Sequence, residues 1–154
     1  MSLPDWLRNG WLTEHQSSKE EISGLLGIIE RDLGTAQNTS IPSDWRFAIA
    51  YNAALQMATA ALAASGYRAS RESHHYRTIH SLEFTLVTDA PRVRSLDAFR
   101  KKRNLGNYEM GGGISDREVS EMFELALGLR KDLEKWLRVN HPKLLWLRRF
   151  FRMF

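Results

Sequence analysis

The feature that most constrains the fold is a run from Trp45 to Ala64 in which apolar and small side chains cover every side of a helix. A helix that is apolar all round must be covered by neighbours, either in its own chain or at an oligomer interface. Its many alanines allow neighbouring backbones to approach closely, and Gly66 is placed to end it. The run therefore predicts a central helix surrounded by others.

The segments on either side also repeat with a helical period. Ser17 and Ser18, followed by Glu20 and Glu21, form two possible capping boxes before an amphipathic helix that reaches Ala36. We expect further helices over about 70–87, which would bury Tyr76, and over the stretch that carries Leu96 and Phe99. A last helix starts at the capping box of Ser115 and Glu118 and ends near Pro142. No segment shows sustained alternation of two, so we predict an all-α fold, an antiparallel up-and-down bundle of four to five helices.

Length and composition bound the remaining possibilities. The chain has 154 residues, which suits one domain, and we divide it into an extension (1–16), the helical bundle (17–140) and a C-terminal segment (141–154). The chain has no cysteine, which excludes disulfides, thiolate zinc sites and cysteine nucleophiles. No run approaches the roughly 18 apolar residues of a membrane-spanning helix. We expect a cytoplasmic protein.

The positive charge is unevenly distributed. The chain has 22 Lys and Arg against 18 Asp and Glu, and four of its cations follow Pro142, where there is no acid. Large apolar side chains alternate with these arginines. As a helix, the segment 142–154 could lie on an anionic membrane surface, stack on RNA or dock on another subunit. Alternatively, its apolar residues pack back onto the bundle.

A second basic patch lies inside the predicted bundle. Arg100, Lys101, Lys102 and Arg103 are consecutive, and they are followed by three polar residues at helical spacing, Asn104, Asn107 and Tyr108. Arg103 and Asn107 lie one helical turn apart, as do Asn104 and Tyr108, so they could contact one ligand. A guanidinium binds phosphate through two donors, and a tyrosine can stack on a base. The patch therefore indicates phosphate binding, unless it is simply a solvated helical face.

Several short motifs together resemble the HEPN family of small helical bundles. In order, they are Tyr51-Asn52-Ala53-Ala54, Gly66-Tyr67-Arg68, His74-His75, Thr78-Ile79-His80-Ser81-Leu82, and Phe99 to Asn104 followed by Tyr108. The resemblance covers about residues 20–137. It implies an RNA- or nucleotide-binding bundle that pairs as a homodimer and is often encoded beside a nucleotidyltransferase-type antitoxin in toxin–antitoxin pairs.

One departure from the family pattern affects the expected activity. The family's ribonucleases carry an arginine, usually followed by a polar residue, and a histidine four to six residues further on. Arg103 and Asn104 fit the first half, but the window for the histidine holds Tyr108, Glu109 and Met110. A tyrosine with a pKa near 10 is a poor proton acceptor at neutral pH. We therefore predict binding first, through Arg100, Lys101, Lys102, Arg103 and Asn107.

Two alternatives stay open. The first is a metal-independent ribonuclease whose catalytic residues are Arg103, Asn104 and Tyr108, with His75 or His80 completing the site from the preceding helix. The second is a non-catalytic interaction bundle that uses its C-terminal segment. The histidines at 75 and 80 do not share a helical face as a metal pair at i and i+4 would, so we predict no metal and no cofactor. The glycines at 111–113 are expected to form a flexible hinge.

Overall fold

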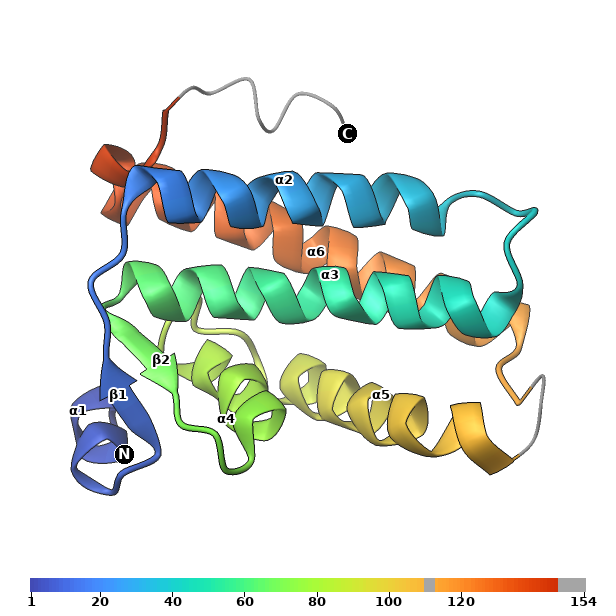
Figure 1. Ribbon diagram of the computed structural model, residues 1–154, viewed down its shortest axis with the longest axis horizontal. Coiled ribbons are helices and arrows are strands. Elements are labelled where there is room, and N and C mark those ends of the chain that lie inside the picture. Colours follow the sequence, from blue (N-terminus) through green and yellow to red (C-terminus); the bar gives the residue numbers. More distant parts are fainter. Residues whose placement is uncertain (110–112, 147–154) are drawn as a thin grey trace.

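The computed structural model describes residues 1–109 and 113–146, with side chains described up to Asn104 and again from Gly113. The prediction of an α-helical fold is confirmed, since helices dominate and the sheet is small (Figure 1). The elements, in order, are α1 (Leu3–Arg8), β1 (Leu12–Glu14), α2 (Lys19–Ala36), α3 (Ser43–Ala64), β2 (Tyr67–Ala69), α4 (His74–His80), the 3₁₀ turn η1 (Ser81–Glu83), α5 (Ala90–Glu109), α6 (Asp116–Asn140) and the 3₁₀ turn η2 (Pro142–Leu144).

Helix α3 lies at the centre, as its apolar composition predicts. It packs against α2 and α6, and its remaining side contacts α4 and α5. Phe47, Tyr51 and Met57 are all at most 1% exposed, and Ala50, Ala53 and Ala54 between them are buried as well. The apolar surface of α3 is therefore largely covered within one chain, which removes the reason to expect subunits to pair through this helix.

The long segments run in alternate directions along the molecule (Figure 1). Helix α2 runs one way, α3 returns, α4 and α5 follow one another in line, and α6 returns again. The caps agree with the sequence. Ser18 Oγ accepts the amide of Glu21 at 3.1 Å, and Ser115 and Glu118 form a complete capping box at the start of α6.

The N-terminal extension is folded, which the sequence did not indicate. Strand β1 pairs antiparallel with β2, with Leu12 opposite Ala69 and Glu14 opposite Tyr67. Trp6, Leu12, Leu62 and Ala69 form a second small core. Three-residue strands are too short to show the alternation by which strands are recognised, so this small sheet could not be predicted from the sequence.

The segment predicted as one helix over about 70–87 is divided into shorter elements in the structure. Residues 70–73 form a turn after β2, α4 covers seven residues, and a 3₁₀ turn follows. Ser73 adopts a left-handed conformation at φ 54°, which separates the turn from α4. Ile79 and Leu82 are buried as predicted, whereas Tyr76 is 36% exposed, which corrects the expectation that it is a core residue.

A buried ion pair joins α2 to α6. Arg130 Nε donates to Glu30 Oε1 at 2.6 Å, and both side chains are less than a tenth exposed. Burial raises the pKa of Glu30 above its ordinary value, and the hydrogen bond from Arg130 opposes that shift. Next to it, Asn52 donates to Asp32 at 2.8 Å, so Asn52 links α3 to α2.

The C-terminal segment is described as far as Trp146. Leu144 and Leu145 pack against the main core, and Lys19 lies 5.0 Å from the centre of the Trp146 ring. The start of the segment thus packs back onto the helices, and residues 147–154, which carry all three of its arginines, lie outside the described part. One described helix, α3, is long and apolar enough to cross a membrane, contrary to the sequence expectation, but 67% of its 18-residue apolar window is buried in the molecule.

Candidate functional site

The candidate site lies where α3, α4 and α5 meet. Arg103 comes from α5, His75 from α4 and Tyr51 from α3, and we call these three residues the Arg103 cluster. The guanidinium carbon of Arg103 is 5.6 Å from the centre of the Tyr51 ring. The His75 ring centre is 6.4 Å from the same ring. An arginine and a histidine therefore lie beside one aromatic side chain.

Tyr51 keeps its proton at neutral pH. Burial raises the pKa of Tyr51 to about 12, although Arg103 and Arg100 act in the opposite direction. Its hydroxyl is buried and has no hydrogen-bond partner among the described residues. Tyr51 can therefore donate a hydrogen bond but cannot accept a proton as a base.

His75, unlike Tyr51, can accept a proton at neutral pH. Burial lowers the pKa of His75 below its ordinary value of 6.5, and the neighbouring His74, Arg103 and Arg100 lower it further. The ring is therefore neutral at neutral pH and has a nitrogen lone pair available. A neutral imidazole close to a fixed guanidinium is an arrangement that can accept a proton near a bound phosphate.

Arg103 is held in position by its surroundings. Its side chain is half-buried, and its buried Nε has no hydrogen-bond partner among the described residues. A guanidinium within about 6 Å of an aromatic ring centre is attracted to the ring face. No ion pair to a described carboxylate satisfies Arg103, so its charge is available to an anion.

The neighbouring cations have other partners. Arg100 Nε donates to Asp97 Oδ1 at 2.8 Å, and Lys101 Nζ lies 3.7 Å from Asp97 Oδ2. Lys102 forms an ion pair with Glu118 at the start of α6, and its hydrogen bond lowers the pKa of that carboxyl. The four consecutive cations thus do not form one phosphate-binding face, because successive helical residues point about 100° apart.

His80 belongs to a second group beside the Arg103 cluster. Its buried Nε2 lies 3.8 Å from Asp97 Oδ1, which is too long for a hydrogen bond, and its ring lies 4.2 Å from the Tyr76 ring. Asp97 therefore accepts a hydrogen bond from Arg100 and lies beside His80 without bonding to it. Asp97 was not singled out from the sequence, although its spacing of three and four to Arg100 and Lys101 is the usual signal of helical ion pairs.

The structure describes the remaining predicted site residues only in part. Asn104 is exposed on α5. The backbones of Asn107 and Tyr108 belong to α5, but their side chains lie outside the described residues, as do Met110, Gly111 and Gly112. Of the sequence-predicted site, the structure brings together Arg103, Arg100 and His75. Within the described residues, no group of three or more His, Asp and Glu side chains could hold a metal ion.

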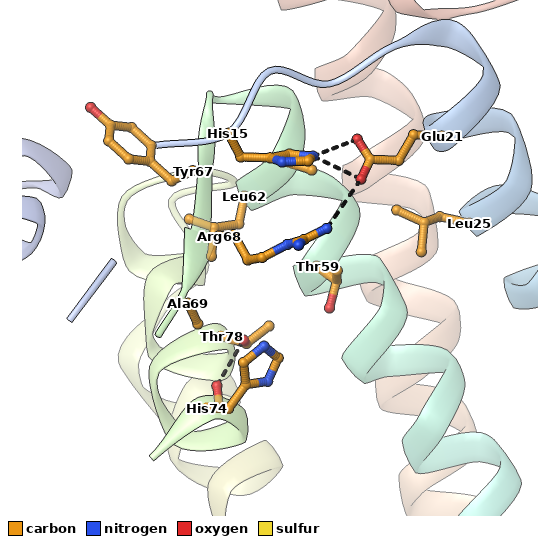
Figure 2. A pocket seen from close by; sticks show the side chains of 11 residues that line it. His15, Glu21, Leu25, Thr59, Leu62, Tyr67, Arg68, Ala69, His74 and Thr78 are labelled. Carbon is orange, nitrogen blue, oxygen red and sulfur yellow. Dashed lines mark hydrogen bonds and ion pairs between the residues drawn. The ribbon is translucent and has the colours of Figure 1, made fainter. Parts of the chain in front are cut away.

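A separate pocket of about 220 Å³ opens between α2, α3, β2 and α4 (Figure 2). His15 Nε2 lies 2.8 Å from both carboxylate oxygens of Glu21, and Arg68 Nη2 lies 3.9 Å from one of them. Figure 2 shows both side chains directed at Glu21. Neither His15 nor Glu21 was predicted as a site residue, because they come together only when β1 pairs with β2.

Comparison with known proteins gives no relative for this chain. No family model, no curated protein and no solved structure matches it.

Proposed function

We propose that this protein is a HEPN-like RNA- or nucleotide-binding protein whose phosphate-binding residue is Arg103. The observation that carries the proposal is the position of the Arg103 guanidinium beside the Tyr51 ring, without a described carboxylate partner. A guanidinium held in this way offers a phosphate two parallel donors. Lys101, whose side chain is 66% exposed, adds long-range attraction that salt should weaken.

The test is the affinity of the full chain for a labelled single-stranded RNA. Arg103→Ala should weaken binding by about 10- to 100-fold, which corresponds to about 1.5–3 kcal/mol for a charged hydrogen bond. Arg94→Ala is the matched control, because Arg94 is an exposed arginine of the same helix. Equal losses in the two variants, or no binding by the wild type, would contradict the proposal.

A second candidate function is metal-independent cleavage of RNA, and the lowered pKa of His75 favours it. In this reaction His75 takes the proton of a ribose 2′-hydroxyl, and the 2′-oxygen forms a bond to phosphorus. The bond from phosphorus to the 5′-oxygen breaks, that oxygen gains a proton from solvent, and Arg103 stabilises the charge on phosphorus. The products are a cyclic phosphate and a 5′-hydroxyl.

Cleavage is tested in EDTA with an RNA and with the same strand carrying one 2′-deoxy residue at the cleaved position. We expect cleavage of the RNA alone, with His75→Gln and Arg103→Ala both inactive. His141→Gln is the control, because His141 lies at the end of α6 and belongs neither to the Arg103 cluster nor to the pocket. RNA binding without any cleavage by the wild type would leave the protein a binding module and reject this candidate.

The proposal extends to a homodimer and to a nucleotidyltransferase-type antitoxin as partner. Both come from the resemblance, and the burial of α3 means that subunits would pair through other helices. Light scattering of the purified chain tests the homodimer. A mass of twice 17.8 kDa supports it, and a single 17.8 kDa species rejects it.

A further inference from the structure

The pocket beside the Arg103 cluster has the size and lining of a site for one flat ring. Its volume of about 220 Å³ exceeds that of cavities of about 150 Å³ that take up benzene, but it is smaller than the usual 300–1,000 Å³ of sites for larger ligands. The walls are apolar and come from three elements, namely Leu25 of α2, Leu62 and Ala63 of α3, and Ala69 of β2. The occupant is therefore one ring system and not a whole nucleotide.

Polar groups at the edge of the pocket offer both kinds of hydrogen-bonding atom. The Glu21 carboxylate has further lone pairs beyond the contact to His15 Nε2. Arg68 lies 3.9 Å from that carboxylate, beyond hydrogen-bond distance, so its guanidinium keeps its donors, and its side chain is 62% exposed. A carboxylate acceptor and a guanidinium donor thus lie side by side (Figure 2).

Two threonines add acceptors deeper in the pocket. Thr59 donates its hydroxyl hydrogen to the carbonyl of Leu55 at 2.9 Å, and Thr78 donates to the carbonyl of His74 at 2.8 Å. Each hydroxyl oxygen is left with lone pairs only, so it accepts hydrogen bonds from a ligand. Such a lining favours a ring that carries both N–H and C=O groups over a hydrocarbon.

The pocket is close to the Arg103 cluster. His74 lines the pocket, and the next residue, His75, belongs to the cluster, with the two ring centres 5.9 Å apart. A nucleotide whose phosphate lies near Arg103 could therefore place a neighbouring base in the pocket. Single-stranded RNA is recognised in this way, by unstacked bases that enter side-chain pockets and are read at their hydrogen-bonding edges.

We propose that this pocket binds one unstacked guanine base of the RNA, which takes the place of His15 Nε2 at Glu21, so that the Glu21 carboxylate accepts two N–H groups and Arg68 donates to the neighbouring carbonyl oxygen. Guanine has two adjacent N–H donors on its Watson–Crick edge, at N1 and N2, beside the acceptor O6. Adenine and cytosine present an acceptor nitrogen where the carboxylate would lie, and uracil has one N–H between two carbonyls. The inference rests on the proposed function, because RNA is what brings the base to the pocket.

The experiment is a titration of the full chain with guanosine, inosine, adenosine and uridine, followed by the NMR signals of the His15 and His74 rings. Guanosine should shift both rings and bind at least about tenfold more tightly than inosine, which lacks the N2 amino group. Glu21→Gln should remove this preference, and Glu20→Gln, an exposed neighbour on the same helix turn, should keep it. Arg68→Ala should weaken guanosine binding, with the exposed Arg71→Ala as its control.

The outcomes separate the two proposals. If RNA binds in an Arg103-dependent way but no nucleoside shifts the His15 and His74 signals, the guanine site is rejected and the proposed function stands. Equal binding of all four nucleosides, unchanged in Glu21→Gln, also rejects it. Guanosine binding without any RNA binding supports the pocket and its ligand class but rejects the proposed function.

Discussion

Tyr51 connects the core of this protein to its candidate site. Its ring is 1% exposed in the central helix, and the same ring lies beside Arg103 and His75. The buried hydroxyl has no hydrogen-bond partner among the described residues, and a buried hydroxyl that is left without any partner costs folding free energy. A Tyr51 hydroxyl that lowers stability in this position is explained if it donates a hydrogen bond to a bound phosphate or sugar.

Tyr51→Phe should therefore separate stability from binding. Removing the unpaired hydroxyl should leave the free energy of unfolding within about 1 kcal/mol of the wild type, or raise it, while RNA binding weakens. Tyr51→Ala should cost about 3–5 kcal/mol, because it leaves a large cavity. Urea unfolding and RNA titration measure the two effects, and a loss of stability in Tyr51→Phe without any change in RNA binding would show that the hydroxyl is structural.

His75 should make the protein less stable in mild acid. Its pKa is lower in the folded protein than in the unfolded chain, so the unfolded state binds more protons below the ordinary value of 6.5. The contribution to stability is complete above that pH and is lost progressively as the pH falls toward the folded pKa. Urea unfolding between pH 7.5 and 5 checks this. His75→Gln should be less sensitive to pH than the wild type, and equal sensitivity in both would contradict the assignment.

The sequence offers candidate site residues, but it does not show which of them lie together. Arg103 could be singled out by its motif, and His75 by its place in the preceding helix. The contact of both with Tyr51 depends on how α4 and α5 pack on α3, which no local spacing reveals. His15, Glu21 and Arg68 were not predicted together, because they meet only through the pairing of β1 with β2.

At the scale of elements, α2 and α6 are joined by the buried pair of Glu30 and Arg130. Burial of both charges makes their attraction strong and makes the loss of one partner costly. The boundaries of α2, α3 and α6 were predictable from caps and periodicity. The end of α4 at His80 was not, because the apolar spacing continues through the 3₁₀ turn at Ser81–Glu83.

Glu30→Ala should lower the free energy of unfolding by about 3–5 kcal/mol, since it removes one partner of a buried ion pair. The exposed pair of Arg117 and Glu121 on α6 is the control, with side chains 88% and 51% exposed. Glu121→Ala should change stability by less than about 1 kcal/mol. Urea unfolding of both variants tests the difference, and similar small losses in the two would show that the buried pair contributes little.

At the scale of the whole molecule, the folded N-terminal extension and the central helix together position both candidate sites. The extension supplies His15 to the pocket, and α3 supplies Tyr51 to the Arg103 cluster and Thr59, Leu62 and Ala63 to the pocket. The two sites meet at His74 and His75 on α4. Adjacent residues of one short helix therefore belong to the two candidate sites.

The most direct measurement is an NMR titration of the full chain with a short single-stranded RNA, which follows the His75 ring signals in the wild type and in Arg103→Ala. Our account predicts that RNA shifts the His75 signals in the wild type and shifts them far less in the variant. RNA binding that leaves the His75 signals unmoved would place the binding site elsewhere and contradict the account.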